Sequence, residues 1–427
     1  MKFLVLCLIL ASIEAVVVNL SQARSNLAAT SVNGFAIFAG GNKDMEIVAT
    51  VDIIDSNGIL FNTANLSVPR LFLAATTINE LALFAGGESP TEISSVVDIY
   101  NSSSGDWTTS SLSEPRTYLS ATTINNLAIF AGGQNSTTTN SDRVDIFNAT
   151  SGSWTTASLS EPRALLVSVS VGNFALFAGG SNDNISSTVD IYDATTGNWE
   201  TASLSEGRNW LAAASAGELA AFGGGQVSSS IISPQVDIFN ATSKTWSTAL
   251  LSAARSYFTA TSVGNLIIFG CGSEGDYQYT PTVDILDTST NQWSIDTMYP
   301  ARGSLAATSF GNLAFFGGGI DSTGPSSAVN IFTLCSNGTL IQTLECSQAK
   351  SQLWIYILSA VCGGLIVVGI ALFLILRRRK RGYSPLSQSS IREVRDVTIE
   401  ERLGGGQFGD VYRGTLEVVD LVECDLM

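Results

Sequence analysis

The sequence predicts an all-β fold, a seven-bladed β-propeller, followed by one transmembrane α-helix and a short, mostly disordered cytoplasmic tail. Three observations predict it. A unit of 45 to 47 residues recurs seven times between residues 24 and 346, an uncharged apolar run covers 353–376, and five consecutive cations follow at 377–381. A period of this length, with four short β-rich runs per unit, is typical of propeller blades. An apolar run of this length is enough to cross a bilayer as a helix of about 36 Å.

Each unit carries the same landmarks at nearly constant spacing. An arginine opens the unit, and a glycine pair begins sixteen residues later. The arginines are Arg24, Arg70, Arg116, Arg163, Arg208, Arg255 and Arg302. The pairs begin at Gly40, Gly86, Gly132, Gly179, Gly224 and Gly318, and Cys271-Gly272 takes the place of the pair in the sixth unit. A Val-Asp-Ile triplet comes next in six units, and ten residues after its valine stands Phe61, Trp107, Trp154, Trp199, Trp246 or Trp293. The seventh unit has Val329-Asn330-Ile331 and a two-residue insertion, which places Ile341 at the equivalent position.

The β-rich runs of the third unit are 119–124, 127–131, 143–147 and 153–157, with turn residues between them. The apolar run, the glycine pair, the triplet and the aromatic residue together resemble the kelch repeat. The resemblance implies a kelch-type β-propeller, residues 16–346, with four strands per blade. Glycine permits close approach of backbones at the end of the second strand, and the aromatic residue anchors the outer strand between neighbouring sheets. Either 16–20 or 338–343 is expected to close the last blade.

One face of the propeller is the candidate binding face. The distance from each triplet valine to the next arginine is constant, so length varies only between the glycine pair and the triplet. Repeat proteins usually place such variable loops on the binding face. Two residues after each arginine, on the same face, stand Asn26, Phe72, Tyr118, Leu165, Trp210, Tyr257 and Ser304. The aromatic members, Phe72, Tyr118, Trp210 and Tyr257, are predicted to contact a ligand, although packing at the blade junctions also explains them.

Composition excludes several classes of function. The chain has no histidine, which excludes Ser-His-Asp and Cys-His nucleophile systems and imidazole metal sites. No catalytic residue and no metal ligand is therefore predicted. Residues 16–352 carry 11 Lys and Arg against 27 Asp and Glu, which argues against nucleic acid as a partner. The repeated arginines and the triplet aspartates Asp52, Asp98, Asp145, Asp190, Asp237 and Asp284 are expected to form structural ion pairs.

Several signals predict a type I plasma-membrane glycoprotein with its propeller outside the cell. Residues 1–15 are typical of a signal peptide, 347–352 form a linker, and 353–376 form the membrane span. Cys335 and Cys346 are a candidate disulfide, and Cys271 is expected to be a lone core thiol. All eight Asn-X-Ser/Thr sequons precede the span, at Asn19, Asn65, Asn101, Asn135, Asn148, Asn184, Asn240 and Asn337.

The tail divides into a basic juxtamembrane segment, 377–396, and residues 397–427. In the second part, a Gly-X-Gly-X-X-Gly pattern followed by Val-Tyr-Arg-Gly resembles the glycine-rich loop that opens a tyrosine-type protein kinase domain. The resemblance implies ATP contacts from Leu403, Gly404, Gly405, Gly406, Gln407, Phe408, Gly409 and Val411. No lysine follows Lys380, and the His-Arg-Asp and Asp-Phe-Gly motifs are missing. We therefore expect no phosphotransferase activity and no cofactor as written, and ATP with magnesium only in a longer product.

The sequence thus predicts a receptor-like membrane glycoprotein whose propeller binds an extracellular protein or glycan. Tyr383 is a candidate docking site for cytoplasmic signalling proteins. Two alternatives stay open: a fragment of a receptor tyrosine kinase that phosphorylates proteins, and an adhesion protein with a vestigial tail.

Overall fold

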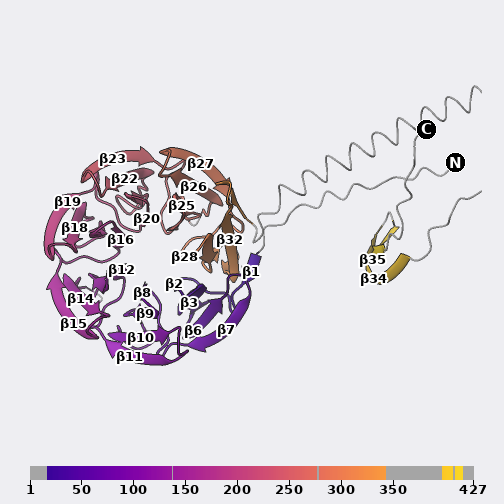
Figure 1. Ribbon diagram of the computed structural model, residues 1–427, viewed down its shortest axis with the longest axis horizontal. Coiled ribbons are helices and arrows are strands. Elements are labelled where there is room, and N and C mark those ends of the chain that lie inside the picture. The colour runs from indigo at the N-terminus through magenta and orange to yellow at the C-terminus, as the bar shows by residue number, and fades with distance from the viewer. Residues whose placement is uncertain (1–16, 137, 277, 343–396, 407–408, 417–427) are drawn as a thin grey trace, which may run out of the picture. The chain divides into compact units, whose positions relative to one another are not determined.

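The computed structural model describes residues 17–136, 138–276, 278–342, 397–406 and 409–416. Residues 17–342 form seven antiparallel sheets arranged in a ring around a central channel (Figure 1). The strand that follows the repeated arginine lies innermost in each sheet, as β2 (Ala28–Val32), β8 (Ala74–Ile78) and β28 (Ala306–Phe310) show. The residues described in this range contain no α-helix. The prediction of an all-β, seven-bladed propeller is confirmed.

Six blades have four strands each, which follow one another from the channel outward in chain order. Blade 1 consists of β2 (Ala28–Val32), β3 (Phe35–Ala39), β6 (Thr50–Ile54) and β7 (Leu60–Asn65), with a small hairpin of β4 (Asn42–Lys43) and β5 (Glu46–Ile47). Blade 2 consists of β8 (Ala74–Ile78), β9 (Leu81–Ala85), β10 (Val96–Asn101) and β11 (Trp107–Ser111). Blade 3 consists of β12 (Ser120–Ile124), β13 (Leu127–Ala131), β14 (Arg143–Asn148) and β15 (Ser153–Ser158).

The next three blades repeat this order. Blade 4 consists of β16 (Val167–Val171), β17 (Phe174–Ala178), β18 (Thr188–Asp193) and β19 (Asn198–Ser203). Blade 5 consists of β20 (Ala212–Ala216), β21 (Leu219–Gly223), β22 (Gln235–Asn240) and β23 (Thr245–Leu250). Blade 6 consists of β24 (Thr259–Val263), β25 (Leu266–Gly270), β26 (Thr282–Asp287) and β27 (Gln292–Thr297).

Blade 7 closes the ring with strands from both ends of the repeat region. Its inner strands are β28 (Ala306–Phe310), β29 (Leu313–Gly317) and β32 (Ala328–Leu334), with a short hairpin of β30 (Ile320–Asp321) and β31 (Gly324–Pro325). Strand β1 (Val17–Asn19) pairs with the first part of β32, and β33 (Leu340–Ile341) pairs with its last part. The sequence left two candidates for the closing strand, and both are used.

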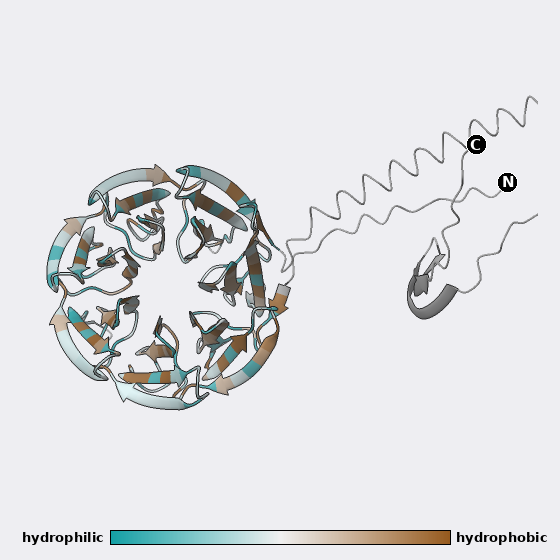
Figure 2. Cartoon of the chain, viewed as in Figure 1, coloured by the Kyte–Doolittle hydropathy of each residue, from teal (hydrophilic) through white to brown (hydrophobic). Residues whose placement is uncertain are grey.

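The core lies between neighbouring sheets. Brown apolar residues alternate with teal polar ones on β10, whereas the outer strand β11 is mostly pale (Figure 2). Trp107 on β11 lies 5.1 Å from Tyr100 and 6.1 Å from Phe84, ring centre to ring centre, and packs on the cluster shared by blades 1 and 2. The predicted role of the outer-strand aromatic residue is confirmed there.

Blade 1 departs from this pattern. The pairing of β6 with β7 shifts between Ile53 and Ile54, so that Leu60 pairs with Ile54 and Asn62 pairs with Ile53. Phe61 falls between the two pairs and is 63% exposed, while Leu60 packs against the core of blades 7 and 1. The expectation that Phe61 anchors the outer strand is wrong, because this bulge moves it out of register.

The repeated arginines hold each blade together from inside. All seven are fully buried, and six pair with the triplet aspartate of their own unit. Arg116, for example, donates to Asp145 at 2.5 Å and to the carbonyl of Gly132 at 2.7 Å. Burial lowers the pKa of Arg116, and the Asp145 carboxylate opposes that shift. The structural interpretation of these pairs is confirmed.

The glycine pairs join neighbouring blades. The N–H of Gly133 donates to the carbonyl of Arg163 in the next blade at 2.9 Å, and Gly319 makes the equivalent bond to Arg24 at 2.8 Å. The last blade therefore meets the first with the same contact as the other blades. Gly132 has φ +65°, and a Cβ there would lie 2.6 Å from the carbonyl oxygen of Arg163. Glycine is required by both the backbone conformation and the close approach.

The described part of the tail forms a separate two-stranded antiparallel hairpin of β34 (Val397–Gly406) and β35 (Gly409–Leu416). The predicted membrane span, 353–376, lies outside the described residues, as do the signal peptide and the basic segment. Within the described ranges we find no helix long and apolar enough to cross a membrane.

Candidate functional site at the mouth of the channel

The residues two positions after the repeated arginines form a ring at one end of the central channel, which we call the collar. All seven have a left-handed backbone, with φ between 51° and 60°. This conformation costs a residue other than glycine about 1–2 kcal/mol, so neighbouring structure must hold it in place. The collar consists of Asn26, Phe72, Tyr118, Leu165, Trp210, Tyr257 and Ser304.

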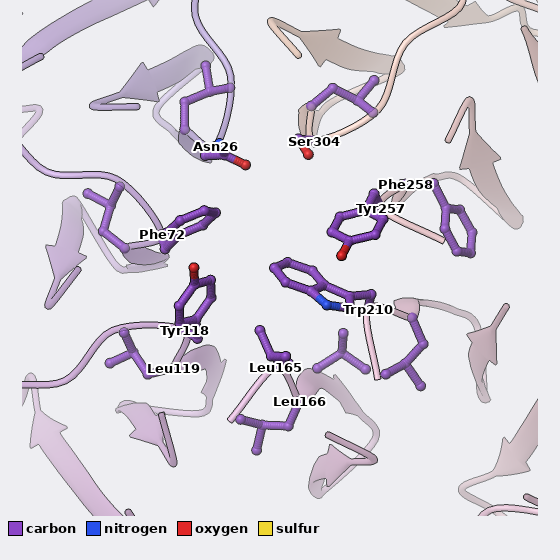
Figure 3. A pocket seen from close by; sticks show the side chains of 15 residues that line it. Asn26, Phe72, Tyr118, Leu119, Leu165, Leu166, Trp210, Tyr257, Phe258 and Ser304 are labelled. Atoms are coloured by element: carbon purple, nitrogen blue, oxygen red, sulfur yellow. The ribbon is translucent and has the colours of Figure 1, made fainter. Parts of the chain in front are cut away.

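Backbone hydrogen bonds run from blade to blade along the collar. The N–H of Phe72 donates to the carbonyl of Asn26 at 3.1 Å, Tyr118 donates to Phe72 at 3.2 Å, and Leu165 donates to Tyr118 at 3.1 Å. Across the closure of the ring, Ser304 donates to Tyr257 at 2.7 Å and Asn26 donates to Ser304 at 3.0 Å. These bonds run around the channel and hold the left-handed conformation, while the collar side chains lie in the channel mouth (Figure 3).

The four aromatic side chains of the collar contact one another. Phe72 and Tyr118 lie 4.2 Å apart between ring centres, and Trp210 and Tyr257 lie 4.4 Å apart, each pair with an interplanar angle of 30°. Tyr118 meets Trp210 edge to face at 5.7 Å. The sequence-based candidates are thus brought together in one cluster. They pack against one another, as the alternative explanation by packing at the blade junctions expected, and they also line the cavities at the channel mouth.

Two cavities share the collar as a wall. The outer cavity, about 540 Å³, is bordered by the collar and by residues of the variable loops, among them Asn42, Gln226, Asp276 and Tyr279. The inner chamber, about 300 Å³, is bordered by the collar and by the apolar residues that follow it, among them Leu73, Leu119, Leu211 and Phe258. Volumes of a few hundred cubic ångströms are typical of ligand pockets.

The collar is uneven. Aromatic residues occupy the positions of blades 2, 3, 5 and 6, whereas blades 7 and 1 contribute the small polar residues Ser304 and Asn26. Figure 3 shows a gap in front of these two side chains, bordered by Phe72 on one side and by Tyr257 and Trp210 on the other. Both Ser304 and Asn26 belong to the walls of both cavities. We call this opening the notch.

The variable loops stand beside the collar, as the spacing argument expected. Isolated β-bridges join the residue before each collar position to the residue after each glycine pair, for example Ser25 to Asn42 and Ser256 to Ser273. The loop residues in the wall of the outer cavity come from blades 1, 5, 6 and 7.

The outer cavity is polar and carries no positive charge on its described lining. Its wall includes the Asp276 carboxylate, the amides of Asn26 and Asn42, and no Lys or Arg. Burial, with a smaller effect of Glu88, raises the pKa of Tyr118 to about 12, so its hydroxyl stays protonated and neutral at physiological pH.

The sequons lie on both faces of the propeller and on its outer strands. Asn101, Asn148, Asn240 and Asn337 lie at the turns between third and fourth strands, as expected. The side-chain oxygen of Asn148 accepts from the N–H of Thr150 at 2.9 Å, which leaves its side-chain nitrogen for a glycan. Asn135 and Asn184 lie in the variable loops of blades 3 and 4, away from the loops that line the outer cavity, and Asn19 and Asn65 are exposed on outer strands.

The remaining predicted residues lie apart from the mouth. Cys271 is a buried free thiol. Cys335 is disulfide-bonded, and its predicted partner Cys346 lies outside the described residues. In the tail hairpin Gly406 pairs with Gly409, Gly405 with Asp410, and Gly404 with Val411. Gln407 and Phe408 lie outside the described residues.

Sequence reasoning missed the notch and the cavity residues Ser256 and Asp276. The notch could have been found from the sequence. The position two residues after each repeated arginine holds small polar residues, Ser304 and Asn26, in the two blades that meet where the ring closes. Nothing in the sequence marked Ser256.

Comparison with known proteins identifies the fold. No family model matches the chain, and no curated protein matches it. Among solved structures, that of YjhT superposes with a TM-score of 0.53 at 15% identity, covering 64% of this chain and 98% of YjhT. The chain is a β-propeller protein. At this identity the likeness shows the architecture alone.

Proposed function

We propose that the propeller is the ligand-binding part of a receptor-like type I membrane glycoprotein, and that it binds an extracellular protein or glycan at the channel mouth. The observation that carries the proposal is the collar: four aromatic side chains from four blades gather between two cavities, on the face that also carries the variable loops. Ligand sites are mostly apolar concavities with a few polar groups, and the outer cavity has both.

The kelch-type assignment belongs to this proposal. The repeated glycine pairs, triplets and outer-strand tryptophans support it, and the seven units cover the propeller. The membrane-bound, extracellular placement rests on the apolar run 353–376, the cations after it and the eight sequons.

A second candidate function concerns the tail. The hairpin of β34 and β35 reverses between Gly406 and Gly409, the place where a kinase glycine-rich loop turns over ATP phosphates. This favours a fragment of a receptor tyrosine kinase as the alternative. Without a strand-three lysine or metal-binding aspartate we expect this chain not to transfer phosphate. Incubating the full-length protein with labelled Mg-ATP and a tyrosine peptide tests that expectation, and measurable turnover would contradict it.

Arrays of extracellular proteins and of glycans test the main proposal. The full-length protein is expected to bind at least one arrayed ligand. Trp210→Ala is expected to weaken that binding about thirtyfold, because an interface anchor contributes about 2 kcal/mol or more. Leu250→Ala is the matched control, since Leu250 is 63% exposed on the outer strand β23 of the same blade and lines neither cavity. Equal loss in both variants, or in neither, would refute binding at the mouth.

A further inference from the structure

The variable loops carry a strong excess of negative charge. In the seven stretches between second and third strands, nine carboxylates face one cation, Lys43. The carboxylates belong to Asp44, Glu46, Glu88, Glu92, Asp142, Asp183, Glu274, Asp276 and Asp321. The loops that border the outer cavity belong to blades 1, 5, 6 and 7 and hold five of these carboxylates, and Glu88 of blade 2 acts on the collar residue Tyr118. The potential at the cavity is therefore negative, which attracts cations and repels anions.

The arginines of the repeat offset this charge only in part: Asp321 interacts electrostatically with Arg302, and Glu274 with Arg255. Their side chains are fully buried, and in six blades the guanidinium pairs with an aspartate inside its own blade. A ligand at the collar therefore meets no exposed guanidinium from the repeat. Arg255, next to the cavity residue Ser256 in sequence, donates to the carbonyls of Cys271 at 2.9 Å and Thr282 at 2.6 Å.

The notch offers aromatic rings to a group that enters it. Phe72 borders it on one side, and Tyr257 and Trp210 border it on the other (Figure 3). A guanidinium or ammonium group is attracted by the negative faces of such rings within about 6 Å of their centres. Neutral and anionic groups lack this attraction.

A buried hydroxyl in the same wall lacks a partner. Ser256 is 1% exposed and borders the outer cavity, and its Oγ makes no hydrogen bond to any described residue. An unsatisfied buried polar atom costs about 1–3 kcal/mol, which a donor from a ligand or a water would remove. Thr117 and Asn209, at the same position in blades 3 and 5, also have an unsatisfied side-chain oxygen. Lysine and arginine side chains only donate hydrogen bonds, and the Ser256 oxygen and the Asp276 carboxylate both accept them.

We infer that the notch receives an arginine or lysine side chain presented by a basic segment of a protein partner. Three independent features agree on this ligand: the acidic loops, the aromatic border and the acceptor oxygens of Ser256 and Asp276. The inference rests on the proposed function and narrows it from a protein or glycan to a basic protein segment. A neutral saccharide would stack on the same rings but would gain nothing from the carboxylates of the loops that border the cavity.

Calorimetric titration of the full-length protein tests the inference with four probes: hexa-arginine, hexa-lysine, hexa-glutamate and the neutral sugar maltotriose. Both cationic peptides are expected to bind with one site per chain, more weakly at 0.5 M than at 0.05 M salt, and the other two probes are expected not to bind. Tyr257→Ala is expected to weaken the cationic peptides about tenfold and Asp276→Asn about threefold.

Controls separate the notch from general attraction to an acidic protein. Asp106→Asn removes an exposed carboxylate from a turn between third and fourth strands and is expected to change affinity less than twofold. Ser256→Ala is a second test of the site for the case that Tyr257→Ala fails to fold, which circular dichroism would reveal, and a loss of about threefold is expected.

Three results would overturn the inference. One is equal affinity of the cationic peptides for wild type, Ser256→Ala and Asp276→Asn, which would mean diffuse surface binding. Another is binding of maltotriose at the collar without binding of the peptides, which would refute the cationic ligand and leave the proposed function standing. The third is the absence of binding by every probe, after which the arrays alone would decide the proposed function.

Discussion

Two layers of this propeller, the repeated arginines (the arginine layer) and the collar, lie only two residues apart in the sequence. The side chain is constant in the first layer and variable in the second. In the arginine layer the side chain is the same in all seven units and is fully buried. In the collar the side chain ranges from serine to tryptophan, while φ stays between 51° and 60°. The backbone bonds of the collar need no particular side chain, whereas the arginine contacts need a guanidinium. The difference indicates that the arginine layer specifies the fold and that the collar is free to specify a ligand.

Blade 7 shows that the arginine layer tolerates the loss of its aspartate partner. Its triplet has Asn330 in place of aspartate, and Arg302 donates to the Asn330 side-chain oxygen at 2.8 Å. Asn330 in turn donates to the carbonyl of Tyr299 at 2.9 Å. The contact between the guanidinium and the second residue of the triplet therefore recurs in all seven blades, with or without an opposite charge.

The largest expected effect on stability comes from breaking one ion pair of the arginine layer. Asp98→Ala leaves the buried guanidinium of Arg70 without its carboxylate and removes the acceptor for the N–H of Ser67. We expect the free energy of unfolding to fall by about 3–5 kcal/mol. Asp106→Ala in an exposed turn of the same blade is the control, within about 0.5 kcal/mol of wild type. Urea unfolding measures both, and equal losses would contradict the assignment.

The next effect tests the junction between blades. Gly132→Ala adds a Cβ 2.6 Å from the carbonyl oxygen of Arg163 at φ +65°, whereas Gly152→Ala in the same blade has φ +69° and open space around the new atom. Gly152→Ala carries only the left-handed strain, about 1 kcal/mol. Gly132→Ala adds overpacking, for a total of about 2–4 kcal/mol. Similar melting temperatures for the two variants would show that the junction has room.

A smaller effect is expected in the collar. Leu165→Asn places a residue that tolerates left-handed backbone at φ 60°, so we expect stability to stay constant or rise by up to about 1 kcal/mol. Leu166→Ala, one residue on and buried, is expected to lose about 2–5 kcal/mol. Denaturant titration compares the two. A loss of several kcal/mol at Leu165 would mean that collar side chains do specify the fold.

A further effect concerns the titration of Tyr118. Its pKa is raised to about 12, chiefly by burial, from about 10 in an unfolded chain. The protonated form is therefore favoured in the folded protein, so the Tyr118 contribution to stability is complete below pH 10 and is lost as pH rises toward 12. Ultraviolet difference titration of wild type against Tyr118→Phe isolates this group. Ionisation near pH 10 would show that the collar is more open than described.

The repeat made the architecture predictable, because fixed spacing of arginine, glycine pair and triplet encodes the contacts that close each blade. Two fold details were not predictable. Phe61 leaves its position through a one-residue bulge, and the ends of the repeat region share β32 instead of competing for it. The collar was predicted as a position but not as a conformation, because Phe72, Leu165 and Trp210 give no sequence signal for positive φ. The cavities depend on packing across blades, which spacing alone does not encode.

The comparison of the two layers is tested most directly by measuring stability and binding on the same pair of variants, Asp98→Ala and Trp210→Ala. For a ligand found on the arrays, we expect Asp98→Ala to lower the free energy of unfolding by several kcal/mol and to keep wild-type affinity at a temperature where it is folded. Trp210→Ala is expected to lose about thirtyfold in affinity and less than about 1.5 kcal/mol in stability. The opposite pattern, with affinity lost in folded Asp98→Ala and retained in Trp210→Ala, would contradict the account.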